Sequence, residues 1–164
     1  MISCIEMLLE HNFSVRGPLL ETLRKLDNDD FIRNLGIGKG SIRNTLVHLM
    51  NTDIYWINVI AEEDTPALDA EQFQTVDDIA QSWKRIEIEM RDIIANQTDA
   101  SLQYVKRVRL GNDTISFTIA RAFLHMVTHE GHHRGFIVGL LRQMGYDPPN
   151  VNMLRELTQG DGLL

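Results

Sequence analysis

The chain has 164 residues, of which 43% are hydrophobic and 24% are charged, and its formal net charge is -7. This length and composition predict one soluble domain spanning residues 1–164. The acidic balance argues against nucleic acid as a partner, because phosphate binding needs a concentrated basic surface. No segment approaches the roughly 20 apolar residues that span a bilayer, so we expect no membrane partner.

The first residues, MISCIEMLLEHNF, lack the basic region of a signal peptide. Cys4 is the single cysteine, which excludes an internal disulfide, and its apolar neighbours predict a buried thiol. Together these features predict a cytoplasmic protein.

Helical periodicity dominates the first two thirds of the chain. Apolar residues recur about every 3.6 positions over residues 2–27, where Gly17-Pro18 predicts a kink or short break. Residues 28–40, rich in Asp and Gly, predict a loop. Ser41 is a suitable N-cap for a helix that ends near residue 61, and Thr75 for one that ends near residue 97. The residues between them, 62–74, are expected to form a polar linker.

Residues 102–117 differ from the rest, because β-branched and aromatic residues flank Gly111-Asn112-Asp113. They fit a short irregular hairpin and a simple loop about equally well. A last long helix is expected over about 116–144, and a short terminal helix over about 150–158. Four long helices with one irregular connection predict an all-α four-helix bundle.

A run of histidines in the last long helix is the most informative motif. Four of the six histidines fall between His125 and His133, and His125, His129 and His133 recur every four residues on one apolar helical face. Two imidazoles at i and i+4 can bind one metal ion from a single helix. His48 is the one other histidine set in a comparable apolar pattern. The spacing therefore predicts a divalent metal site of His48, His129 and His133.

The competing interpretation is a set of core histidines hydrogen-bonded to carbonyl groups. It requires several buried rings to find separate partners, and each failure costs roughly 1–3 kcal/mol, whereas one shared metal satisfies them all. His132 points off the stripe. His125 lies one turn back and fits either a fourth ligand or, as we favour, a polar neighbour of the metal ligands. His11 is expected on the surface. Glu130 fits the His-Glu-x-x-His pattern of zinc proteases, but no third ligand follows it, so we reject that function.

The ending His132-His133-Arg134-Gly135, with Ser41-Ile-Arg-x-x-x-x-His48 upstream, resembles the DinB/YfiT superfamily of four-helix-bundle proteins over nearly the whole chain. The resemblance implies a divalent ion, often nickel or zinc, held by His48, His129 and His133. Characterised members of that superfamily include bacillithiol S-transferases and mycothiol-dependent isomerases. It therefore implies a low-molecular-weight thiol as co-substrate and a small electrophilic molecule as substrate.

Three neutral imidazoles leave at least one coordination position open, as in catalytic metal sites. A coordinated thiol is deprotonated near neutral pH, so the leading expectation is metal-dependent thiol transfer to a small electrophile. Hydrolysis by a metal-dependent hydrolase is the alternative enzyme function. The non-enzymatic alternative is a metal-stabilised stress-response protein. A polar cavity beside the metal, open to solvent, would favour the two enzyme functions.

Three glycines recur on the side of the last long helix that lies opposite the histidines: Gly131, Gly135 and Gly139. Glycine inside a helix costs about 1 kcal/mol against alanine, which suggests that close packing offsets the loss. Packing within the chain is one explanation. The other, slightly favoured, is a two-fold homodimer built on this face.

Overall fold

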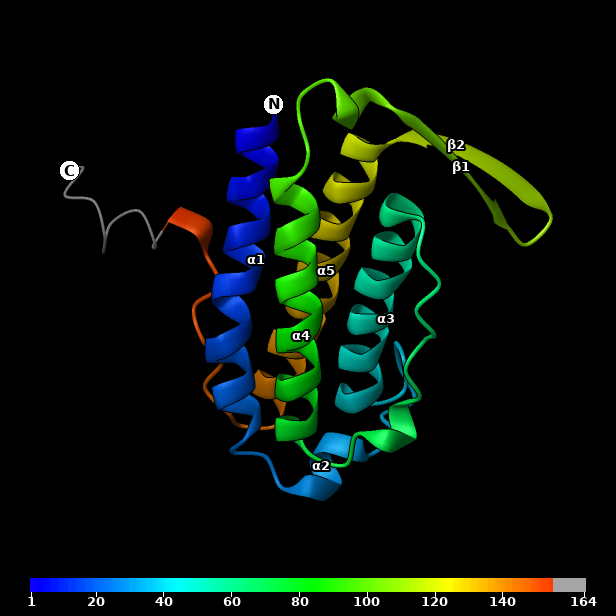
Figure 1. Ribbon diagram of the computed structural model, residues 1–164. Coiled ribbons are helices and arrows are strands. Elements are labelled where there is room, and N and C mark those ends of the chain that lie inside the picture. Colours follow the sequence, from blue (N-terminus) through cyan, green and yellow to red (C-terminus); the bar gives the residue numbers. More distant parts are fainter. Residues whose placement is uncertain (155–164) are drawn as a thin grey trace.

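The computed structural model describes residues 1–154. Four long helices form a bundle: α1 (Ile2–Leu23), α3 (Ile42–Ala61), α4 (Val76–Ala95) and α5 (Ile119–Gln143) (Figure 1). α3 packs against α4 and α5, and α1 packs against the same two helices. One continuous hydrophobic core runs between the four helices. The expected all-α bundle is confirmed, and none of the described helices is both long enough and apolar enough to cross a membrane.

Side-chain caps fix where two of these helices begin. The Ser41 hydroxyl accepts a hydrogen bond from the Asn44 backbone N–H (3.0 Å), as predicted for the start of α3. Thr75 and Asp78 form a reciprocal capping box at the start of α4. His48 follows this N-cap by seven residues, or about two turns of α3.

Pro18 lies inside α1, and the chain stays helical through it to Leu23, so the predicted break does not occur. The helix forgoes one hydrogen bond, the one that proline cannot donate. The expected burial of two residues of α1 was also wrong. Cys4 is exposed and His11 is buried, with 8% of its surface accessible. The buried side of α1 also includes polar residues such as Asn12 and Arg16, so the apolar spacing alone does not define its inward face.

The two connections contain more structure than expected. The predicted loop 28–40 begins with a short helix, α2 (Asn28–Ile32), whose Phe31 is buried against α3. The predicted linker 62–74 contains the 3-10 turn η1 (Ala70–Gln72), and a second 3-10 turn, η2 (Ser101–Gln103), follows α4. Of the expected terminal helix, residues 153–154 are helical, 150–152 are not, and 155–158 lie outside the described residues.

The irregular connection is a hairpin, the first of the two alternatives. Strands β1 (Val105–Leu110) and β2 (Asp113–Thr118) pair in antiparallel register from Val105 opposite Thr118 to Leu110 opposite Asp113. Gly111 in the turn has φ +60°, a left-handed conformation that glycine adopts readily. The hairpin projects from one end of the bundle (Figure 1), and β2 leads directly into α5.

Candidate metal centre

One histidine from α3 and two from α5 converge on the same point between the two helices. Nε2 of His48 lies 3.2 Å from Nε2 of His129. The ring centroid of His133 is 4.9 Å from that of His48 and 4.6 Å from that of His129. One ring nitrogen from each residue lies within 4.8 Å of the other two. Sequence spacing selected these three residues, and the fold brings them together.

The geometry of this three-histidine group suits a metal ion. Imidazole nitrogens bind zinc at about 2.0–2.1 Å, which places two ligands of a tetrahedral site about 3.4 Å apart. The two Nε2 atoms can share a hydrogen bond only if one of them carries a proton, whereas a cation accepts both lone pairs. The group could therefore hold a metal ion.

The surroundings of the three-histidine group keep its rings neutral. Burial, together with the charges of Lys39 and His133, lowers the pKa of His48 to about 4. Burial and the neighbouring histidines lower the pKa of His129 to about 4 as well. The pKa of His133 is lowered by burial, by His132 and by Lys39. Neutral imidazole is the form that coordinates metals, so at pH 7 the group is ready to bind one without releasing protons.

The other two histidines of the run flank the three-histidine group. His125 is exposed, and its ring centroid lies 5.5 Å from that of His129 and 5.6 Å from that of Trp56. His132 is exposed beside His133, with 5.1 Å between their ring centroids. Neither belongs to the metal-competent group.

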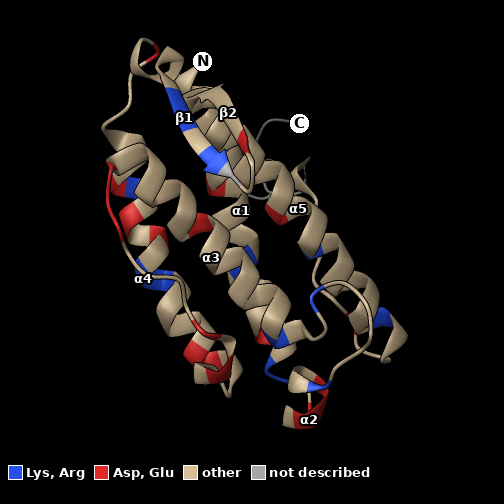
Figure 2. Cartoon of the chain, turned by 90° about the vertical axis from the view of Figure 1, so that its right-hand side faces the viewer, with Lys and Arg blue, Asp and Glu red and all other residues tan. Residues whose placement is uncertain are grey.

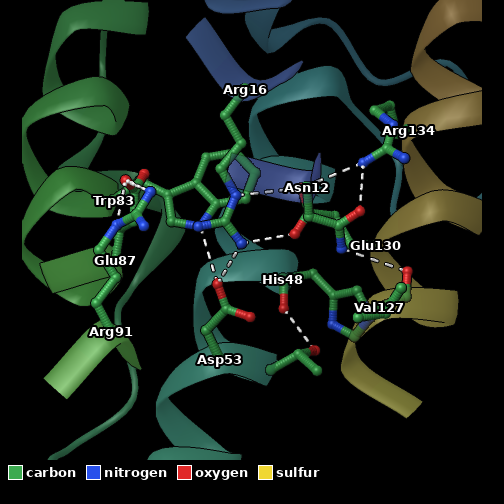
Figure 3. Close-up of polar contacts among 11 residues, drawn as sticks. Asn12, Arg16, His48, Asp53, Trp83, Glu87, Arg91, Val127, Glu130 and Arg134 are labelled. Atoms are coloured by element: carbon green, nitrogen blue, oxygen red, sulfur yellow. Dashed lines mark hydrogen bonds and ion pairs between the residues drawn. The ribbon is translucent and has the colours of Figure 1, made fainter. Parts of the chain in front are cut away.

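Figure 3 shows a buried ionic network between the long helices, which the sequence analysis did not predict. Arg16 of α1 is at its centre: its Nη2 is 2.6 Å from Oε2 of Glu130 and 2.9 Å from Oδ2 of Asp53. Asp53 also accepts a hydrogen bond from Nε1 of Trp83 (3.0 Å). Nη1 of Arg134 donates to the Asn12 side chain (3.0 Å) and lies 3.4 Å from Glu130. All four long helices contribute to this network.

The ionic network is buried, and its opposite charges stabilise one another where an unpaired charge would be costly. Burial opposes the charge of Arg16, but Glu130 and Asp53 outweigh it, so the pKa of Arg16 rises. Burial raises the pKa of Asp53 to about 6 in spite of Arg16. The Arg16 guanidinium also lies 4.3 Å from the centre of the Trp83 ring. Both carboxylate oxygens of Glu130 accept hydrogen bonds from Arg16, a pairing that does not suit the general base of a protease.

A cavity of about 320 Å³ opens one helical turn from the three-histidine group. It is bounded by α3, β2 and the first turns of α5, and its lining residues are Trp56, Ile115, Ser116, Phe117, Arg121, Ala122 and His125. His125 lines this cavity and lies next to His129. The position of this cavity could not be predicted from the sequence, because it depends on how the hairpin packs over the bundle.

The fold and the site together define a helical-bundle protein with a three-histidine centre between two helices. The chain belongs to the DinB family, which it matches over residues 1–161. It is 26% identical over 152 residues to protein DinB of Bacillus subtilis (strain 168), covering 85% of each chain. It is 21% identical over 145 residues to the uncharacterised protein YizA of the same organism, covering 88% of this chain and 91% of YizA.

Solved structures of DinB-like proteins share the fold. One from Bacillus cereus ATCC 10987 aligns with a TM-score of 0.65 at 15% identity, covering 88% of this chain and 95% of its own. The DinB-like protein YjoA of Bacillus subtilis aligns with a TM-score of 0.61 at 16% identity, covering 88% and 96%. At these identities the likeness concerns the bundle alone.

Proposed function

We propose that this protein is a metal-dependent enzyme whose divalent ion, nickel or zinc, is bound by His48, His129 and His133. The observation that carries the proposal is the convergence of three neutral imidazoles from two helices at a partly exposed point. Structural zinc sites are usually closed by four protein ligands, whereas a three-histidine set leaves room for a small molecule. The cavity beyond His125 offers such a molecule a place to bind.

The reaction that this arrangement supports best is transfer of a low-molecular-weight thiol to a small electrophile. A divalent ion bound by three imidazoles would favour the deprotonated thiol at neutral pH. A carbon–sulfur bond then forms at the electrophile, the leaving group departs with its bonding electrons, and the thiol proton passes to solvent. The chain contributes three neutral ligands and an entrance bordered by His125, while the ionic network holds α3 and α5 at a fixed separation.

Two other functions could use the same three histidines, and they differ in whether they need the cavity. A hydrolase would use the same three ligands and the same cavity, with water in place of the thiol. A metal-stabilised protein without catalytic activity needs no cavity beside its metal. The cavity lined by Trp56, Arg121 and His125 is mostly apolar, in contrast to the polar cavity expected beside the metal, but it is open to solvent at Arg121 and His125 and so supports an enzyme over a passive scaffold.

Metal analysis followed by an activity screen tests this proposal. The protein is purified without a nickel column, its metal content is measured, and small thiols are offered with a chromogenic electrophile such as 1-chloro-2,4-dinitrobenzene. Thiol-dependent product that is lost in the His48→Ala variant supports transfer. Turnover of ester substrates without thiol would support the hydrolase instead, and no metal-dependent turnover of either kind would contradict an enzyme.

We also propose a homodimer built on the glycine face of α5. A Cβ added at Gly135 or Gly139 would meet nothing within 4 Å in the described part of the chain. Leu124, nearer the start of α5, keeps 43% of its surface exposed. In a dimer, Gly135→Leu would weaken association without loss of bound metal, as sedimentation and metal analysis would show. A wild-type monomer at micromolar concentration would contradict the dimer.

A further inference from the structure

The cavity beside the three-histidine group has rigid apolar walls. Trp56, Phe117 and Ala122 form part of its lining, and each is at least nine-tenths buried. The rings of Trp56 and Phe117 meet edge to face, with centroids 5.1 Å apart and planes at 87°. At about 320 Å³, the cavity falls within the size range of small-molecule sites.

One full positive charge borders the cavity, and no acidic residue lines it. Arg121 lies in the first turn of α5, where its backbone N–H donates to the Thr118 hydroxyl. It forms no ion pair with any residue in the described part of the chain, whereas Arg16 and Arg134 are both paired inside the bundle. An unpaired guanidinium beside an apolar cavity favours a ligand that carries a carboxylate, because the two groups form paired, charge-assisted hydrogen bonds.

The cavity and the histidines lie along one line on α5. Arg121, His125 and His129 follow each other at intervals of four residues, so they share a helical face. Eight residues of helix separate Arg121 from His129 by about 12 Å along the axis. A ligand anchored at Arg121 would pass Trp56 and His125 before it reached the three-histidine group. In Figure 1 the strands of the hairpin leave the bundle at the N-terminal end of α5, where this line begins.

We propose that this cavity binds the electrophilic substrate, and that the substrate is an elongated organic anion with a flat apolar body. Its carboxylate pairs with Arg121, its body lies against Trp56 and Phe117, and its reacting end extends past His125 toward His129. The identification of this ligand as a substrate rests on the proposed metal-dependent function. Binding of the anion in the cavity does not, because no metal ligand lines it.

Calorimetric titration of the metal-free protein with 2-naphthoate tests the inference, with the uncharged 2-naphthalenemethanol as the matched probe. Naphthoate should bind with one-to-one stoichiometry and at least about tenfold more tightly than the alcohol, the size of one charge-assisted contact. Arg121→Gln should abolish that preference. Ser116→Trp should fill the cavity and weaken both probes. Arg85→Gln, which removes the same charge from the exposed surface of α4, should change neither affinity by more than about twofold.

Circular dichroism and thermal melting establish that each variant is folded before it is titrated. Equal affinity for the two probes, or naphthoate binding unchanged in either Arg121→Gln or Ser116→Trp, would overturn the inference. The absence of saturable binding to the wild-type protein would overturn it as well. Naphthoate binding to a protein that takes up no metal would leave the cavity as a binding site and contradict only the proposed function.

Discussion

The bundle contains two polar clusters, one whose charges are paired within the chain and one that is neutral and partly exposed. The ionic network around Arg16 pairs its charges within the chain, and its members are among the most buried polar side chains. The three-histidine group is partly exposed and carries no charge, and its ring nitrogens face one another. A network whose charges are paired stabilises the fold, while a cluster with free lone pairs can bind something from outside.

The charges on the surface follow a third pattern. Figure 2 shows lysine and arginine gathered on β1 of the hairpin, while acidic residues mark several turns of α4. Surface pairs such as Arg24 with Asp77 are exposed to water and contribute little to stability. These differences in burial and pairing predict how much free energy of unfolding is lost when each region is disrupted.

The largest effect is expected from Arg16→Met. The substitution leaves Asp53 and Glu130 in the core without their shared cation, and breaking a buried pair in this way costs about 3–5 kcal/mol. Urea denaturation should show a loss of this size in the free energy of unfolding. Arg24→Met, which removes an exposed ion pair, is the matched control and should cost less than about 1 kcal/mol. Equal losses in the two variants would contradict a structural role for the network.

A smaller loss is expected from Trp83→Phe. The change removes the hydrogen bond from Nε1 to Asp53 while keeping most of the ring over Arg16. Asp53 Oδ2 keeps its hydrogen bond from Arg16 but loses the second one, and the loss of a hydrogen bond to a charged group costs about 1.5–3 kcal/mol, which denaturation with urea can measure. The metal content should equal that of the wild type, because the three-histidine group does not include this residue. Wild-type stability in this variant would show that Asp53 does not depend on the indole.

As the pH falls, the two clusters should change the free energy of unfolding in opposite directions. Because the folded pKa of His48 and of His129 is about 4, below the usual 6.5, the unfolded chain takes up protons first as pH falls from about 6.5 to about 4. These histidines therefore lower the free energy of unfolding of the metal-free protein across that window. Asp53, whose folded pKa is raised to about 6, acts in the opposite direction between about 6 and 4.

The His48→Gln variant isolates the histidine contribution to this pH dependence. Urea denaturation at several pH values, with a chelator present, should show that the variant loses less stability than the wild type as pH falls from about 6.5 to about 4. Bound metal in the wild type should be retained from pH 8 to about 6 and released as pH approaches about 4, where the ligands become protonated. Identical pH profiles for the two proteins would mean that His48 has an ordinary pKa.

The sequence was most informative where one residue type repeats with helical spacing. The i, i+4 interval of His129 and His133, with His48 inside an apolar stripe, was enough to predict which histidines meet. The ionic network could not be found this way, because its members are distant in sequence and come from four helices. A weaker signal did exist: Arg16 lies between apolar residues of α1, and Asp53 lies beside the buried Ile54.

Features that depend on tertiary contacts were beyond the reach of local patterns. Residues 102–117 fit a hairpin and a loop equally well, and contact between Phe117 of β2 and Trp56 of α3 favours the hairpin. The same contact forms the wall of the cavity. Cys4 and His11 were misplaced because polar residues of α1, Arg16 among them, are buried as well, so that apolar residues alone do not mark its inward face.

The central claim is that His48, His129 and His133 together bind one divalent ion. Elemental analysis and zinc titration of the wild type, His48→Ala and His132→Ala, all purified without a nickel column, test it most directly. We predict one metal ion per chain in the wild type and in His132→Ala, and a metal-poor but helical His48→Ala variant, since two imidazoles from one helix hold zinc weakly. Full metal occupancy in His48→Ala, or no metal binding by the wild type, would contradict the claim.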